Sequence, residues 1–120
     1  MIRFLAAIQG LYFLLTGVWP LINIISFQKV TGPKTDLWLV KTVGVLVSII
    51  GLVLLLAGWQ GSITFETALL ALGSAAGLMA IDLVYVARRT ILPIYLLDAF
   101  VQFILIAGWV VSGLWLLVTA

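Results

Sequence analysis

Four long stretches without a charged residue dominate this sequence. No Asp, Glu, Lys or Arg occurs in residues 4–28, 42–65, 67–81 or 99–120. A helix that crosses the hydrocarbon core of a membrane needs about 20 mostly apolar residues. Three of these stretches reach that length on their own. The stretch 67–81 is shorter and reaches it only if its helix continues through Asp82 to about Ala87. The runs are continuous rather than alternating, which predicts helices and not a barrel.

We therefore predict an all-α protein whose four transmembrane helices form an up-down bundle. The predicted helices cover about residues 4–27, 37–58, 67–87 and 93–118. Their connections are short, so neighbouring helices must be antiparallel, and a single integral membrane domain fills residues 1–120. The first run is too long for a cleaved signal peptide and has no small-residue cleavage site near its end, which disfavours that alternative.

Local residues support these boundaries. Gly32-Pro33 marks a turn after the first helix. Pro20 lies inside the first predicted helix and cannot donate to the Thr16 carbonyl, which predicts a kink there. Pro93 suits the first turn of the fourth helix.

Composition excludes several classes of protein. The chain is 65% hydrophobic and only 8% charged, whereas soluble domains carry about 25% charged residues. A soluble domain, a disordered chain and a nucleic-acid binder are therefore excluded. With no Cys and no His, disulfides and thiolate sites are impossible, and haem, di-iron and zinc sites lack their usual ligands. We expect no metal and no cofactor.

The basic residues predict an orientation. Five Lys and Arg residues fall at one end of the predicted bundle and Arg3 alone at the other; the five are Lys29, Lys34, Lys41, Arg88 and Arg89. The positive-inside rule places the richer side in the cytoplasm and both termini outside. Trp38, Trp59 and Trp115 fall near helix ends, where an interfacial belt would place them, whereas Trp109 is expected inside the bundle.

One polar residue from each predicted helix falls in the same layer. Asn23, Lys41, Asp82 and Asp98 each lie about one turn from the cytoplasmic end of their helix, roughly 6–8 Å deep at 1.5 Å per residue. Acids and bases inside a membrane usually face the bundle interior and are often functional. The layer predicts a polar site: a proton relay, an ion site, or a pocket for a lipid headgroup or small amphiphile.

A purely structural alternative stays open. In it Lys41 neutralises one aspartate, an arginine of the third loop pairs with the other, and the network only fixes the helix register. In either case we expect Lys41 within salt-bridge reach of Asp82 or Asp98.

Helical periodicity predicts which faces turn inward. The stripes are Gln9, Thr16 and Asn23; Lys41, Gly44, Ser48, Gly51, Leu55 and Gly58; Ala68, Ala75 and Asp82; and Asp98, Gln102, Leu105, Trp109 and Ser112. Small residues let membrane helices approach closely, and polar residues bond across the interface. Gly73 and Gly77 add a GxxxG pattern. Gln102 extends the candidate site toward the middle of the membrane.

Several segments resemble a known group of proteins. These segments are Gly10-Leu-Tyr-Phe-Leu-Leu-Thr-Gly-Val-Trp-Pro20, Ser26-Phe-Gln-Lys-Val-Thr-Gly-Pro-Lys-Thr-Asp-Leu-Trp-Leu-Val-Lys-Thr-Val-Gly44, Asp82-Leu-Val-Tyr-Val and Tyr95-Leu-Leu-Asp-Ala. The chain is similar to small four-helix bacterial membrane proteins of the DoxX type. The resemblance implies a four-helix bundle in a bacterial inner membrane and transfers no activity.

These observations favour a non-enzymatic membrane protein. Its partners are expected to be membrane lipid, a small amphiphile, a second copy or a membrane complex, and not nucleic acid. A small proton-coupled transporter is one alternative, although transporters of the small multidrug-resistance kind need an acid in the middle of the first helix, where this chain has only Gln9. A lipid-modifying enzyme that uses Asp82 and Asp98 as an acid/base pair is the other.

Overall fold

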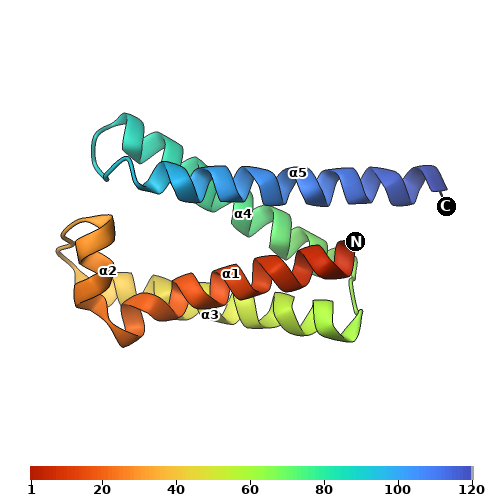
Figure 1. Cartoon of the computed structure of the whole chain (residues 1–120), viewed down its shortest axis with the longest axis horizontal. Helices are drawn as coiled ribbons and strands as arrows, with labels where there is room; N and C mark the ends of the chain where they lie inside the picture. The colour runs from red at the N-terminus through yellow and green to blue at the C-terminus, as the bar shows by residue number, and fades with distance from the viewer. Residues whose placement is uncertain (120) are drawn as a thin grey trace.

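The chain folds into five helices and no strand in the part that the structure describes. A computed structural model describes the backbone of residues 1–119 and the side chains of residues 1–114. The helices are α1 (Ile2–Ile22), α2 (Ile24–Thr31), α3 (Leu37–Gln60), α4 (Phe65–Ala87) and α5 (Tyr95–Thr119). Four of them are long and apolar enough to cross a membrane, and only the short α2 is not. The predicted all-α up-down bundle is confirmed (Figure 1).

The four long helices form two antiparallel pairs, α1 with α3 and α4 with α5 (Figure 1). The pairs meet at the end of the molecule that holds the N-terminus, around the buried side chains of Ala6, Leu54, Ala71 and Trp109. Toward the other end, which holds α2 and the loop between α4 and α5, the pairs diverge (Figure 1). The pairs thus pack together at one end, the closed end of the bundle, and their backbones lie farther apart at the other (Figure 1).

Small residues bring α1 and α3 into backbone contact. A methyl group added to Gly17 would lie 2.8 Å from the Gly44 carbonyl oxygen, and one added to Gly51 would lie 2.5 Å from the Leu14 nitrogen. Real Cβ atoms do not tolerate such distances, so only glycine fits. The predicted seam of small residues on α3 is confirmed for Gly44, Ser48, Gly51 and Gly58, all of which are buried. This packing makes α1 and α3 one unit.

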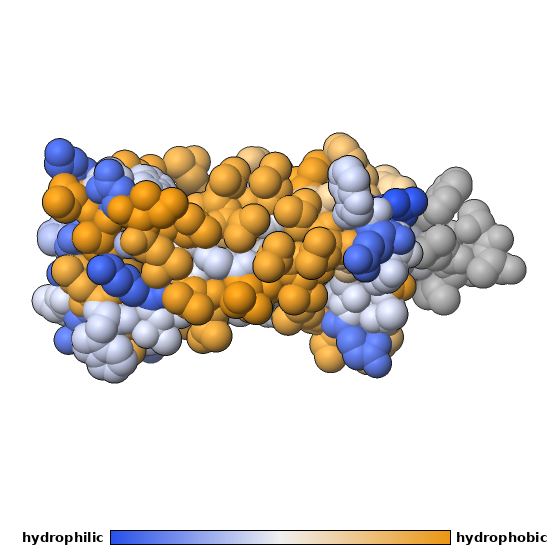
Figure 2. Space-filling model, turned by 90° about the horizontal axis from the view of Figure 1, so that it is seen from below, coloured by the Kyte–Doolittle hydropathy of each residue, from blue (hydrophilic) through white to orange (hydrophobic). Residues whose placement is uncertain are grey.

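The outer surface suits a lipid environment. A broad apolar band covers the middle of the face seen in Figure 2, with polar residues toward both ends of the molecule. Large apolar side chains point outward from every long helix, among them Leu15, Leu46, Leu69 and Phe103, each more than half exposed. Exposed apolar surface on this scale requires a membrane.

The first predicted helix is wrong in its extent. The sequence predicts one helix over about 4–27, but α1 ends at Ile22 and a separate α2 begins at Ile24. The break follows Pro20 by three residues, at Asn23, whose backbone (φ −143°, ψ 81°) is not helical. Proline removes a hydrogen bond from the last turn of α1, and Asn23 then starts α2.

The remaining boundaries need smaller corrections. The sequence places Pro93 in the first turn of the last helix, but α5 begins at Tyr95. Pro93 belongs to the turn before it, where the Leu96 N–H donates to the Pro93 carbonyl at 2.9 Å. Trp38 and Trp59 are exposed near the ends of α3, and Trp109 is 3% exposed, as predicted. The expectation for Trp115 lies outside the described side chains.

The GxxxG pattern of α4 does not pack against any other described part of the chain. A methyl group added to Gly73 or Gly77 would meet no atom within 4 Å. The buried face of α4 instead contains Ala71, Ala75 and Asp82. The spacing of small residues marks two faces of α4, one with Gly73 and Gly77 and the other with Ala71 and Ala75. Of these, only the face with Ala71 and Ala75 packs against α5.

Candidate functional site

A half-open cavity of about 310 Å³ lies between the two helix pairs, toward the end where they diverge. Its lining comes from all five helices and the loop after α2: Phe13, Thr16, Gly17, Pro20, Phe27, Lys34, Val40, Val43, Gly44, Val47, Leu78, Ile81, Asp82, Tyr95, Asp98 and Gln102. Most of this wall is apolar. The polar side chains are therefore the ones that decide what the cavity can bind.

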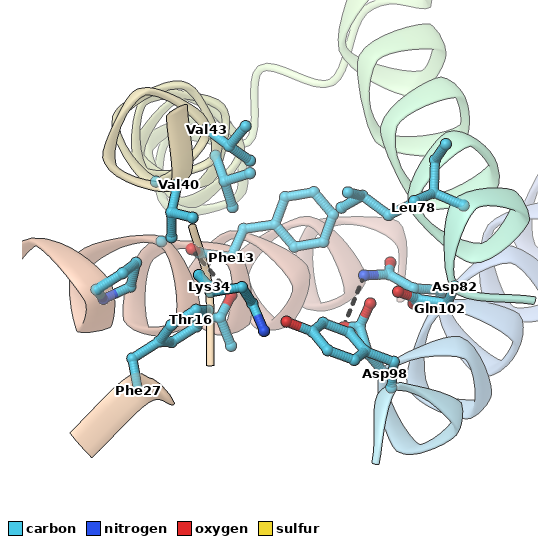
Figure 3. Close-up of a pocket in the computed structure, with 16 residues that line it drawn as sticks. Phe13, Thr16, Phe27, Lys34, Val40, Val43, Leu78, Asp82, Asp98 and Gln102 are labelled. Carbon is cyan, nitrogen blue, oxygen red and sulfur yellow. Dashed lines mark hydrogen bonds between the residues drawn. The ribbon is translucent and has the colours of Figure 1, made fainter. Parts of the chain in front are cut away.

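Asp98 is the centre of a hydrogen-bonded group at the α4/α5 side of the cavity. Its Oδ1 accepts a hydrogen bond from the Tyr12 hydroxyl at 2.5 Å and from Gln102 Nε2 at 3.2 Å. Figure 3 shows the Gln102 amide and the Asp98 carboxyl side by side on α5, with Asp82 next to them. Asp82 of α4 and Asp98 of α5 line the same cavity. Three helices thus converge on one acidic group.

Two acceptors in this group have no hydrogen-bond donor among the residues that the structure describes. Asp82 Oδ2 and Gln102 Oε1 are both buried and unpartnered. Their residues are only 5% and 1% exposed. Buried polar atoms are nearly always hydrogen-bonded, and each exception calls for an explanation. An occupant with N–H or O–H donors would supply one.

Lys34 is the one basic residue in the lining. Its Nζ donates to the carbonyl oxygens of Thr31 and Gly32, both at 3.0 Å. The same ammonium lies 5.3 Å from the centroid of the Tyr95 ring and 6.0 Å from that of Phe27. The end of α2 and two aromatic faces therefore hold this cation at the cavity wall. Figure 3 shows its ammonium and the Asp98 carboxyl reaching into the same space from different sides.

A second cavity of about 250 Å³ lies on the other side of the same group, between α1, α2 and α5. Thr16, Phe27, Tyr95 and Asp98 line both cavities. The Asp98 carboxyl is consequently reachable from two directions. Asp82 and Gln102 line only the first cavity.

The structure brings together three of the five predicted site residues, Asp82, Asp98 and Gln102. Asn23 is not among them, because it is exposed and its side chain accepts a hydrogen bond from the Ser26 N–H at 3.0 Å. Its polar group caps α2 and does not reach the layer. The prediction from depth along a continuous first helix was wrong because that helix ends at this residue.

Lys41 is also in a different place from the one predicted. It is exposed on α3, it does not line the cavity, and within the described side chains it forms no ion pair with Asp82 or Asp98. Three residues later, Gly44 packs against Pro20 near the end of α1. Beyond that point α1 offers Lys41 no surface to pack on, so the side chain extends outward, as long basic side chains do near a membrane surface.

Sequence reasoning missed Tyr12, Lys34 and Tyr95. Tyr12 follows Gln9 by three residues and precedes Thr16 by four, so the polar stripe of α1 was the signal that could have found it. Lys34 lies in a loop, and from the sequence a charged loop residue is as readily explained by exposure to water as by a role in a site. Only the fold shows that this loop returns over the cavity.

Comparisons with protein-family models, curated proteins and solved structures give no match.

Proposed function

We propose that this integral membrane protein binds an amphiphile in the cavity between its two helix pairs. The observation that carries the proposal is the division of one cavity into an apolar wall, including Val43, Val47 and Leu78, and a polar end formed by Asp82, Asp98 and Gln102. Ligand sites of about 300–1,000 Å³ commonly combine a mostly apolar lining with a few polar groups that orient the ligand.

The position of the cavity in the bundle supports a ligand that arrives from the bilayer. Its lining residues on α3, α4 and α5 lie within the spans that are apolar enough to cross the membrane. The half-open side gives a hydrocarbon chain a path between the diverging pairs (Figure 1). A lipid or other amphiphile can enter with its polar group toward Asp82 while its chain stays in apolar surroundings.

We place the protein in a bacterial inner membrane, with the cavity toward the cytoplasm and both termini outside. The basis is the excess of Lys and Arg at the end of the bundle near the cavity, together with the DoxX-type resemblance.

Filling the cavity tests the proposed binding. Val43 and Val47 lie one turn apart on α3 and line the cavity, whereas Val45, on the same helix, does not line it. Val43→Trp and Val47→Trp add bulk to the wall, and Val45→Trp is the matched control on the same helix. The protein is placed in phosphatidylcholine nanodiscs, and dodecylamine and dodecanol are titrated against the midpoint of thermal unfolding.

At least one probe is expected to stabilise the unmodified protein and Val45→Trp, because a ligand of the folded state raises the unfolding midpoint. Either cavity variant should lower the apparent affinity at least tenfold. Equal stabilisation of all four proteins would show that the probes act on the bilayer or on the outer surface, and the proposal would fail.

A further inference from the structure

We propose that the occupant of this cavity carries a primary ammonium group, which donates hydrogen bonds to Asp82 Oδ2 and Gln102 Oε1. The inference rests on the proposed function and names the class of ligand for the same cavity. It starts from the two buried acceptors without a donor. A ligand that completes the site has to bring donors, not acceptors.

The charges in the site point the same way. Asp82 and Asp98 line the same mostly apolar cavity, and two carboxyl groups in such a place need a proton or another cation to neutralise one of them. The donors of Tyr12 and Gln102 both go to Asp98 Oδ1. Asp82 Oδ2 is therefore a buried acceptor without a donor, on a residue that lines the cavity.

No basic side chain of the described part of the chain fills this position. Lys34, the one basic residue in the lining, uses two of its three N–H donors on the carbonyls of Thr31 and Gly32. Lys41 is exposed and outside the lining. A cation other than a proton at this position would therefore come from a ligand.

An ammonium group fits this space better than a metal ion or a hydroxyl. Within the described residues no group of three or more Asp, Glu, His or Cys side chains is placed to hold a metal. A hydroxyl donates a single hydrogen bond and carries no charge, whereas an ammonium donates three. The apolar wall beside Asp82, with Ile81 and Leu78 on the same helix, accommodates the carbon chain of an amphiphilic amine.

Lys34 separates two sources of such a ligand. Its remaining N–H can meet the phosphate of a phosphatidylethanolamine headgroup whose ammonium lies at Asp82. A free alkyl amine has no anion to offer, and for this ligand the Lys34 charge is only repulsive. Removing the charge with Lys34→Gln should weaken binding of the phospholipid and leave or strengthen binding of the amine.

The experiment uses the full chain in phosphatidylcholine nanodiscs, because the quaternary ammonium of that lipid has no N–H to donate. Dodecylamine, dodecanol, dioctanoyl phosphatidylethanolamine and sodium chloride are the probes, and the shift of the unfolding midpoint is the readout. Asp82→Asn and Gln102→Leu each alter one unpartnered acceptor. Asp36→Asn is the matched control, since Asp36 is exposed and forms no side-chain cap with α3.

The shift of the unfolding midpoint that each probe causes in Val47→Trp, whose cavity is filled, is first subtracted as background. After this correction we expect dodecylamine to bind at least tenfold more tightly than dodecanol. Asp82→Asn and Gln102→Leu should each remove that preference, and Asp36→Asn should keep it. If one of the two variants does not fold, the other provides the same test. The effect of Lys34→Gln on binding of dodecylamine and of dioctanoyl phosphatidylethanolamine then shows whether the ligand is an alkyl amine or a phospholipid. Either result supports a ligand with an ammonium group.

Three results would overturn the inference. Dodecanol could bind as tightly as dodecylamine, the preference could survive in the acceptor variants, or sodium alone could stabilise the protein as strongly as the amine. If both dodecyl probes bind equally and Val47→Trp blocks both, the amphiphile cavity stands and only its amine preference fails. If Val47→Trp blocks neither, the proposed function itself fails.

Discussion

Gln9 on α1 links the two helix pairs through Trp109 on α5. The Trp109 indole N–H donates to Gln9 Oε1 at 2.7 Å, and Gln9 Nε2 donates to the Ala71 carbonyl of α4 at 2.9 Å. Both side chains are buried, at 0% and 3% exposure. One amide therefore fixes α1 against α4 and α5 at the closed end of the bundle, and the cavity lies beyond this link.

The Gln9–Trp109 link should be energetically coupled. Gln9→Leu removes the acceptor of the indole and the donor to Ala71, and hydrogen bonds between membrane helices contribute about 0.5–2 kcal/mol. We expect each of Gln9→Leu and Trp109→Phe to lower the free energy of unfolding. The double variant should lose less than the sum by about 0.5–1.5 kcal/mol. Reversible unfolding in mixed micelles measures this cycle, and strictly additive losses would show that the link does not couple the pairs.

Gly51→Ala should destabilise the protein, whereas the same substitution at Gly77 should have almost no effect. Gly51→Ala places a methyl group 2.5 Å from the Leu14 nitrogen, whereas Gly77→Ala meets nothing within 4 Å. Overpacking of this kind lowers the free energy of unfolding by about 1–3 kcal/mol, and Gly77→Ala should change it by less than about 0.5 kcal/mol. Equal losses at both positions in a detergent unfolding assay would contradict the packing of α1 on α3.

Asn23 should control the stability of α2 alone. Its side chain accepts the Ser26 N–H, and loss of such a cap typically costs about 1 kcal/mol. Asn23→Ala should speed hydrogen exchange of the α2 amides severalfold and leave those of α3 unchanged. Asn23→Asp keeps an acceptor and serves as the control. If exchange in α2 is the same in Asn23→Ala as in the unmodified protein, the cap does not hold the helix.

The distribution of basic residues predicts the orientation of the bundle in the membrane. We expect single-cysteine labels at Lys29 and Arg89 to be protected from membrane-impermeant reagent in intact cells, and a label at Ser62 to react. The reason is the bias of Lys and Arg toward the end near α2. Reaction at Lys29 and Arg89 with protection at Ser62 would reverse the orientation.

Sequence reasoning predicted the helices well because long uncharged stretches have few alternatives. A run such as 42–65 has to be buried in lipid or protein, and a helix is what satisfies its backbone there. The same reasoning did not predict the break between α1 and α2. Pro20 and Asn23 cause this break inside an apolar segment, where hydropathy gives no sign of a helix end. The choice between a kink and a full break depended on the Asn23 cap, which composition does not report.

The candidate site was predicted in part, for a similar reason. Asp82 and Asp98 share a depth and an inward face, and the structure places them together. Lys41 shares the depth but not the face, since α1 ends near its level. Lys34 reaches the cavity only because α2 turns back toward α1, which is a property of the tertiary fold. Position along one helix predicts depth, and neighbouring helices decide which residues meet.

The most direct test is to locate a bound amphiphilic amine. A crystal structure of the protein with 12-bromododecylamine would position the chain end by the anomalous signal of bromine. We expect bromine among the apolar side chains of the cavity that include Val43 and Val47, with the ammonium in hydrogen-bond distance of Asp82 and Gln102. Bromine found only on the lipid-facing surface, with the space beside Asp82 filled by water, would contradict the proposed site.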